Sequence, residues 1–231
     1  MRIIRVEHGG TSYYGILEDG LVFRLHQQPG HMEPIPLSEA KVLPLVTPSK
    51  VVCVGLNYKA HAEELGYPLP NMPSFFLKPP SSIIGNGEPI VLPSGMGRIE
   101  HEAELAMVVG KVCRNLTPEE AEESLFGFTC ANDVTAREVQ KVDPLIGHCK
   151  SYDTFCPIGP WIETELEDIN DLSIRCLVNG EVRQSANTGD MIFRPLDLLC
   201  FLSRVMTLMP GDVILTGTPP GISPTQADDV V

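Results

Sequence analysis

The pattern of apolar and polar residues predicts short β-strands near the start of the chain. Alternation gives three strands, at residues 2–7, 12–17 and 21–25, and the glycines in the breaks between them are typical of hairpin turns. Residues 27–50 contain five prolines and predict an irregular connector. We therefore expect a small N-terminal β module at residues 1–49 and a second unit at residues 50–231.

The second unit is predicted to be mostly β, with a few short peripheral helices. Its predicted strands lie at 51–54, 73–78, 172–178, 181–184 and 213–215, and its predicted helices at 57–66, 118–125 and 195–206. The clearest hairpin turn is Asn179-Gly180. The clearest helix is the last one, which carries an apolar stripe and begins at Pro195. The expected fold class is α+β, dominated by β.

Acidic side chains are concentrated in residues 100–104. If residues 100–109 form one strand, as the pattern predicts, Glu100, Glu102 and Glu104 share a face, because alternate residues of a strand do so. Asp133 follows the apolar stretch 126–131 and precedes a predicted helix at 134–140. Carboxylate oxygens without a nearby Cys or paired His suit Mg²⁺, Mn²⁺ or Ca²⁺. From the residues alone, a solvated acidic face and a helix N-cap at Asp133 remain open as alternatives.

Four blocks of sequence resemble the fumarylacetoacetate hydrolase family. They are HEAELAMVVG, GFTCANDVTAREVQ, KSYDTFCPIGPW and GDVILTGTPPG, in the same order and with ordinary spacings. The resemblance implies a rolled mixed β-sheet, a homodimer, and Mg²⁺ or Mn²⁺ held by Glu102, Glu104 and Asp133. It is the resemblance, and not the spacing, that selects Glu102 and Glu104 over Glu100. Family members continue past SPTQADDVV with about two more strands, so we expect the C-terminal strands to be missing from the unit at 50–231.

The same resemblance implies roles for residues outside the acidic cluster. Tyr58, His61 and Glu64 match a Y-x-x-H-x-x-E on a mobile lid helix, where the His/Glu pair activates water. Without the resemblance, His61 would be read as a surface histidine and Glu64 as a solubilising charge. Lys150 matches a lysine that stabilises an enolate beside the metal. The implied substrate contacts are Tyr58, Gln140 and Thr218, the last through its hydroxyl and its backbone amide.

Two further basic residues lie near these motifs. Arg137 follows Asp133 by four residues and is expected to hold the ligand carboxylates in place. Lys78 ends a predicted strand, and we expect it at the mouth of the site, where it would attract a substrate carboxylate.

Composition excludes several classes of function. The 17 basic and 30 acidic side chains give a net charge of -13, which argues against nucleic acid or an anionic membrane as a partner. The glycine-rich TGTPPG lacks the G-x-x-x-x-G-K-[ST] pattern of a phosphate cradle, so neither nucleotide nor another organic cofactor is expected. The 7 cysteines form no CxxC pair, and the chain has no signal-like or membrane-spanning apolar run. These features indicate a cytoplasmic protein.

The expected function is metal-dependent hydrolysis of a C–C bond in small, anionic 2-oxo acids of the acylpyruvate type, through a metal-stabilised enolate. Isomerisation of 2-hydroxyhepta-2,4-diene-1,7-dioate and decarboxylation of oxaloacetate use the same enolate and stay open as alternatives. The alternative from another class is a non-catalytic binding protein in which the acidic cluster holds structural Ca²⁺.

Overall fold

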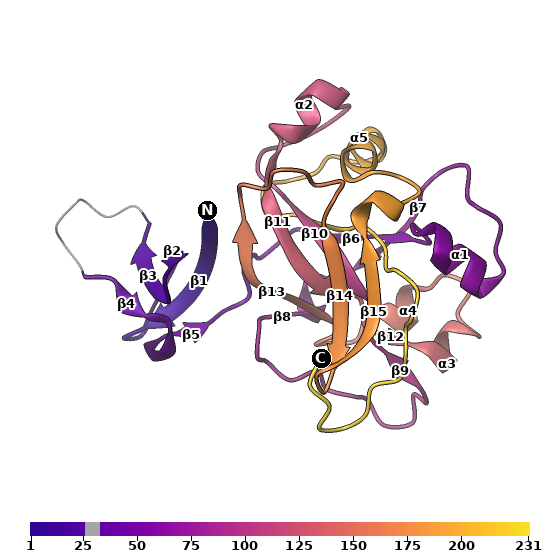
Figure 1. The fold of residues 1–231 in the computed structure, drawn as a ribbon, viewed down its shortest axis with the longest axis horizontal. Helices are drawn as coiled ribbons and strands as arrows, with labels where there is room; N and C mark the ends of the chain where they lie inside the picture. The colour runs from indigo at the N-terminus through magenta and orange to yellow at the C-terminus, as the bar shows by residue number, and fades with distance from the viewer. Residues whose placement is uncertain (26–32) are drawn as a thin grey trace.

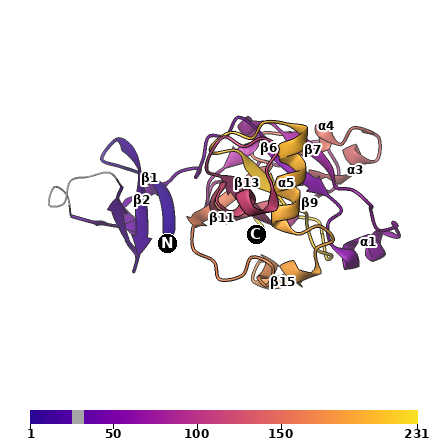
Figure 2. The ribbon, with the colours of Figure 1, turned by 90° about the horizontal axis from the view of Figure 1, so that it is seen from above.

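A computed structural model describes residues 1–25 and 33–231 of the chain, and residues 27–32 of the predicted connector lie outside this described part. The N-terminal residues form a small antiparallel module at one end of the elongated molecule (Figures 1 and 2). Its elements are β1 (Arg2–His8), β2 (Thr11–Glu18), β3 (Leu21–Arg24), β4 (Ile35–Pro36), the 3₁₀ turn Leu37–Glu39 and β5 (Lys41–Val42). The three predicted strands are confirmed, and β1 joins the module to the rest by pairing with β13.

The main sheet is mixed, as expected for this fold class. Its described strands run in the order β4-β3-β2-β1-β13-β11-β10-β16-β6-β7, and β16 and β6 are parallel neighbours. The strands outside the module are β6 (Val51–Gly55), β7 (Ser74–Lys78), β8 (Ile83–Ile84), β10 (Ala103–Val109), β11 (Leu125–Asn132), β13 (Cys156–Glu163) and β16 (Val213–Leu215). The strand β10, which follows the acidic stretch, therefore lies inside the sheet.

Two small β pairs and several short helices surround this sheet (Figure 1). The pairs are β9 (Ile99–Glu100) with β12 (Thr135–Ala136), and β14 (Ser173–Val178) with β15 (Glu181–Asn187). The helices are α1 (Lys59–Leu65), α2 (Pro118–Glu122), α3 (Arg137–Gln140), α4 (Gly147–Lys150) and α5 (Pro195–Val205), with 3₁₀ turns at Pro80–Ser82 and Thr188–Asp190. No helix in the described ranges has the length and apolar character needed to cross a bilayer.

The core packs on both faces of the central strands. On one face, Val51, Ala106 and Val213 join a cluster that includes Ile3 and Ile4 of the N-terminal module. The opposite face of the same strands packs against α5, through residues such as Val52, Met107, Ile214, Leu198 and Leu202. Strands that are buried on both faces read as continuous apolar runs, which is why these segments were recognisable in the sequence.

Two predicted elements are wrong. Residues 100–109 do not form one strand, because β9 ends at Glu100 and β10 begins at Ala103. The break is held by the Asn132 side chain, which accepts from the Glu102 amide at 2.9 Å. The predicted helix at 134–140 is also too long: residues 135 and 136 pair with β9, and only Arg137–Gln140 is helical. The alternative of a helix N-cap at Asp133 is excluded with it, since the residue before α3 is Ala136.

Candidate active site

Glu102, Glu104 and Asp133 meet at one point near the ends of β10 and β11. Each offers one carboxylate oxygen, and these three oxygens lie within 4.8 Å of one another. All three side chains are buried. Oxygens on opposite sides of a Mg²⁺ or Ca²⁺ ion lie about 4.2–5.2 Å apart, from metal–oxygen distances of about 2.1–2.6 Å. The spacing and the all-oxygen donor set therefore fit a hard divalent cation.

Three cationic side chains hold this cluster in place. The ammonium of Lys150 donates to Glu102 Oε2 at 2.7 Å and to Asp133 Oδ2 at 2.6 Å. Lys78 donates to Asp133 Oδ1 at 2.5 Å. Arg137 donates through Nη2 to Glu102 Oε1 at 2.5 Å, which confirms its expected contact with a carboxylate of this cluster. Each of these bonds fixes the direction of a carboxylate oxygen of the cluster.

The surrounding charges shift the pKa values of Glu102 and Glu104 in opposite directions. Burial alone would raise the pKa of Glu102, but the charges of Lys150 and Arg137 outweigh it and hold the pKa at about 2. The pKa of Glu104 lies well above its ordinary value, because the residue is buried and faces the charges of Asp133 and Glu102. Its hydrogen-bond donor is the Gly217 amide, at 2.5 Å from Oε2. A divalent cation would relieve this repulsion.

The predicted lid residues lie together on α1. His61 is buried, and its Nδ1 lies 2.8 Å from Glu64 Oε2. A carboxylate only accepts, so Nδ1 carries a hydrogen, and in the neutral form of the ring Nε2 is an acceptor. Glu64 also receives the Gly221 amide at 3.2 Å, which connects the helix to the loop after β16.

Tyr58 immediately precedes α1 and is buried, and its hydroxyl has no hydrogen-bond partner among the residues that the structure describes. Burial and the charges of Glu104 and Asp190 raise the pKa of this phenol, so it stays protonated. An unpaired buried hydroxyl is costly unless a ligand satisfies it. Tyr58 therefore has a free donor near the carboxylate cluster.

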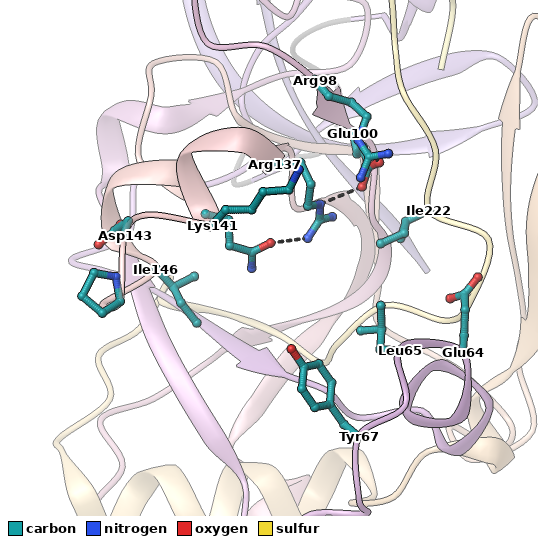
Figure 3. A pocket seen from close by; sticks show the side chains of 12 residues that line it. Glu64, Leu65, Tyr67, Arg98, Glu100, Arg137, Lys141, Asp143, Ile146 and Ile222 are labelled. Atoms are coloured by element: carbon teal, nitrogen blue, oxygen red, sulfur yellow. Dashed lines mark hydrogen bonds and ion pairs between the residues drawn. The ribbon is translucent and has the colours of Figure 1, made fainter.

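A pocket of about 640 Å³ opens between α1 and α3 (Figure 3). Glu64 and Leu65 line one side, and Arg137 and Gln140 line the other. Arg137 also donates to Gln140 Oε1 at 2.6 Å. Arg137 lines this pocket and also donates to Glu102, whereas the three clustered carboxylates are not among the residues that line it.

Two predicted residues occupy different environments from those expected. The Thr218 hydroxyl accepts from Gln184 Nε2 at 2.8 Å and donates to the Ala103 carbonyl at 3.0 Å, so it is already engaged within the protein. Lys78 is 1% exposed and lies beneath Asp133, where it also donates to the Phe155 carbonyl at 2.7 Å. Its predicted place at the site mouth is wrong, because strand β7 directs it into the core.

Sequence reasoning also missed two contributors. Glu100 accepts from Arg137 Nε at 2.7 Å and from Arg98 Nε at 2.9 Å, so it orients the arginine that holds Glu102. Gln184 is 1% exposed and accepts from the Ala103 amide, which lies between Glu102 and Glu104. The spacing of Glu100 from Glu102 and Glu104 marked it as a functional candidate, but as a possible metal ligand and not as a partner of Arg137. The sequence gives no signal for Gln184, because it is an ordinary polar residue in the strand that follows the hairpin turn.

Comparison with known proteins adds three findings. Residues 50–231 match the family model described as fumarylacetoacetate (FAA) hydrolase C-terminal, and residues 1–44 match one described as Rv2993c-like, N-terminal. The chain is 45% identical over 195 residues to human oxaloacetate tautomerase FAHD2A, mitochondrial, which covers 81% of this chain and 62% of that protein.

Two solved structures have closely similar folds. The 2-hydroxyhepta-2,4-diene-1,7-dioate isomerase from Mycobacterium marinum has a TM-score of 0.90 and 37% identity, covering 99% of this chain and 91% of its own. Maleylpyruvate hydrolase from Sphingobium, in complex with manganese (II) ion and pyruvate, has a TM-score of 0.83 and 32% identity, covering 99% and 92%.

A mixed sheet with a buried carboxylate cluster, and a family model that matches most of the chain, together define the class. The chain belongs to the fumarylacetoacetate hydrolase family and is an enzyme.

Proposed function

We propose that this enzyme hydrolyses a C–C bond in small, anionic 2-oxo acids of the acylpyruvate type, with Mg²⁺ or Mn²⁺ at Glu102, Glu104 and Asp133. The observation that carries the proposal is the approach of these three carboxylate oxygens to within 4.8 Å of one another. When bound there, a divalent cation supplies Lewis-acid polarisation of a substrate carbonyl. The similar structure of maleylpyruvate hydrolase was solved with manganese (II) ion and pyruvate. This supports the proposal that the present enzyme binds a metal ion and a 2-oxo acid.

His61 and Glu64 are suited to activate water. Because Nδ1 is held by Glu64, Nε2 can take a proton from a water molecule that adds to the distal carbonyl carbon. The bond between that carbon and C3 of the 2-oxo acid then breaks, and its electron pair forms the enolate. The acyl part leaves as a carboxylic acid, and protonation of the enolate gives the shorter 2-oxo acid.

Lys150 is suited to stabilise the developing enolate. Its ammonium is fixed by Glu102 and Asp133, and their charges raise its pKa although burial alone would lower it. A positive charge that is already in place costs no reorganisation during the reaction. The free hydroxyl of Tyr58 and the amide of Gln140 at the pocket wall are the donors that we assign to the substrate.

Isomerisation or keto–enol tautomerisation of a 2-oxo dicarboxylate is the second candidate. It is favoured by the relatives named as an oxaloacetate tautomerase and a dienedioate isomerase. The same lysine would stabilise the same enolate, but no water would be added. The His61–Glu64 pair is therefore the feature that separates the two candidates.

A substrate panel with lid variants tests this proposal. Acetylpyruvate, maleylpyruvate and oxaloacetate would be assayed with Mg²⁺, with Mn²⁺ and with chelator. We expect hydrolysis of the acylpyruvates, and we expect it to require metal. The hydrolysis rate should fall about 100-fold or more in Glu64→Gln and in His61→Ala, because each variant removes part of the general base. The matched control is Glu63→Gln, an exposed neighbour on α1, which should keep wild-type rates. Tautomerisation without hydrolysis would establish the second candidate, and no turnover with intact metal binding would contradict both.

A further inference from the structure

Gln184 joins two parts of the site that are distant in the sequence. Its Oε1 accepts from the Ala103 amide at 2.9 Å and from His101 Nδ1 at 3.0 Å. Its Nε2 donates to Thr218 Oγ1 at 2.8 Å and to the Pro219 carbonyl at 2.7 Å. The amide therefore bridges the segment that carries the ligand glutamates and the loop after β16.

The backbone partners fix the orientation of this amide. The Ala103 N–H can only donate and the Pro219 carbonyl can only accept, so the oxygen faces the strand and the nitrogen faces the loop. His101 Nδ1 must then carry a hydrogen, and its Nε2 accepts from the Ser223 hydroxyl at 2.8 Å. Flipping the amide would break the bonds to both backbone groups at once. The bridge thus has one stable geometry.

The loop that Gln184 holds contacts both functional groups of the site. The Gly217 amide donates to Glu104 Oε2, and the Gly221 amide donates to Glu64 Oε1. Between these two glycines lie Thr218 and Pro219, the residues that Gln184 binds. Gly221 has a φ of +94°, and a Cβ there would lie 2.2 Å from the Arg183 carbonyl oxygen. The loop is therefore packed directly against the strand β15 that carries Gln184.

We propose that Gln184 is a positioning residue that sets the loop 217–221, and through it the placement of Glu104 and of the His61–Glu64 pair. The Ala103 amide lies between Glu102 and Glu104, so the same side chain also fixes the segment from which both carboxylates project. The expected effect of Gln184 on kcat rests on the proposed function. Its expected effect on the position of the loop 217–221 does not.

Gln184→Met tests the proposal, because it keeps the length of the side chain and removes all four hydrogen bonds. We expect hydrogen exchange at the Gly217 and Gly221 amides to rise at least ten-fold, Mn²⁺ affinity to fall several-fold, and kcat to fall more than KM changes. Thr218→Val removes the bond from Gln184 to the Thr218 hydroxyl and the bond from that hydroxyl to the Ala103 carbonyl, and it is the second variant if Gln184→Met does not fold. It should accelerate exchange at the same two amides.

Ser203→Ala is the matched control. Ser203 is fully buried in α5, where it accepts from the Leu116 amide and donates to the Cys200 carbonyl. It should lower the melting temperature without changing exchange at Gly217 and Gly221, Mn²⁺ affinity or kcat. The proposal is overturned if Gln184→Met destabilises the protein while exchange at those two amides stays within two-fold of wild type. Hydrogen exchange is measured without substrate or metal, so its result tests the role of Gln184 even if the proposed hydrolase activity is not found.

Discussion

At the scale of single residues, the site consists of buried carboxylates that are paired with buried ammonium groups to different extents. Glu102 and Asp133 each contact Lys150, and Asp133 also contacts Lys78. Glu104 has a backbone amide as its donor, and its pKa is raised because it is buried beside the other two carboxylates. The three carboxylates are therefore unequal, and Glu104 would gain the most from a bound cation.

Lys150→Met should separate chemistry from metal binding. The substitution leaves the three carboxylates in place but removes the charge that we assign to the enolate, so turnover should fall about 10²–10³-fold. Mn²⁺ affinity should persist, because a competing cation has been removed. Steady-state kinetics and calorimetric Mn²⁺ titration measure the two effects. Lys111→Met, an exposed lysine that does not line the pocket, is the control and should retain turnover within about two-fold. Equal loss of metal binding and turnover in Lys150→Met would contradict the assignment.

Lys78→Met should destabilise the fold. The ammonium is fully buried against Asp133, and removal of one partner of a buried pair costs about 3–5 kcal/mol. Saturating Mn²⁺ should recover part of this loss, because it would compensate the charge of Asp133. Urea denaturation with and without Mn²⁺ measures both quantities. The exposed Lys111→Met should change the unfolding free energy by about 0.5 kcal/mol or less. A cost for Lys78→Met as small as that would show that the pair is not buried as described.

At the scale of elements, the sequence predicted those helices and hairpins that are determined by residues close together in the chain, such as caps and turns. Thr117 and Glu120 form a capping box at the start of the predicted helix α2, and the Asn179-Gly180 turn joins β14 and β15. Strand β13 was missed because its sequence contains Pro157 and Pro160, which are rare inside a sheet. Its place between β1 and β11 depends on long-range pairing that no local pattern encodes.

The junction between the parallel strands β6 and β16 depends on Asp212. Its carboxylate accepts from the Ser49 amide and hydroxyl at 2.9 and 2.7 Å, from the Met209 amide at 2.8 Å and from the Lys50 ammonium. Burial alone would raise the pKa of Asp212, but these donors outweigh it and lower the pKa below its ordinary value of 3.8. The carboxylate therefore stabilises the fold at neutral pH.

Asp212→Asn should be destabilising in a pH-dependent manner. A depressed carboxyl pKa contributes stability above the unfolded value, and the contribution is lost as the pH falls through the folded value. The variant should therefore lose about 1–3 kcal/mol at pH 7, and its difference from wild type should shrink below pH 3.8. Urea denaturation across this range measures the difference. A difference that stays constant between neutral and acidic pH would contradict the role of the charge.

At the scale of the whole molecule, the site is assembled from segments far apart in the sequence. Glu102 and Asp133 are 31 positions apart, and the loop at 217–221 arrives through β16 beside β10. The motifs identified the ligand candidates, but the residue spacing could not choose between Glu100 and Glu104. The structure separates them: Glu104 joins the carboxylate cluster, whereas Glu100 pairs with Arg98 and Arg137. Buried partners such as Lys78 and Gln184 depend on this assembly and have no sequence motif of their own.

The homodimer remains a prediction of the family resemblance. Sedimentation equilibrium of the purified chain measures it, with a mass near twice 25.3 kDa as the expected result. A monomer at all concentrations would contradict it.

Calorimetric titration of Mn²⁺ into wild type, Glu104→Gln and Glu100→Gln tests the central claim most directly, because the two variants make the same carboxyl-to-amide change at positions four residues apart. We predict one ion per chain in wild type, no measurable binding in Glu104→Gln, and binding weakened by about ten-fold or less in Glu100→Gln, which only orients a partner of the ligands. Wild-type affinity in Glu104→Gln would contradict the claim that these three carboxylates hold a single cation.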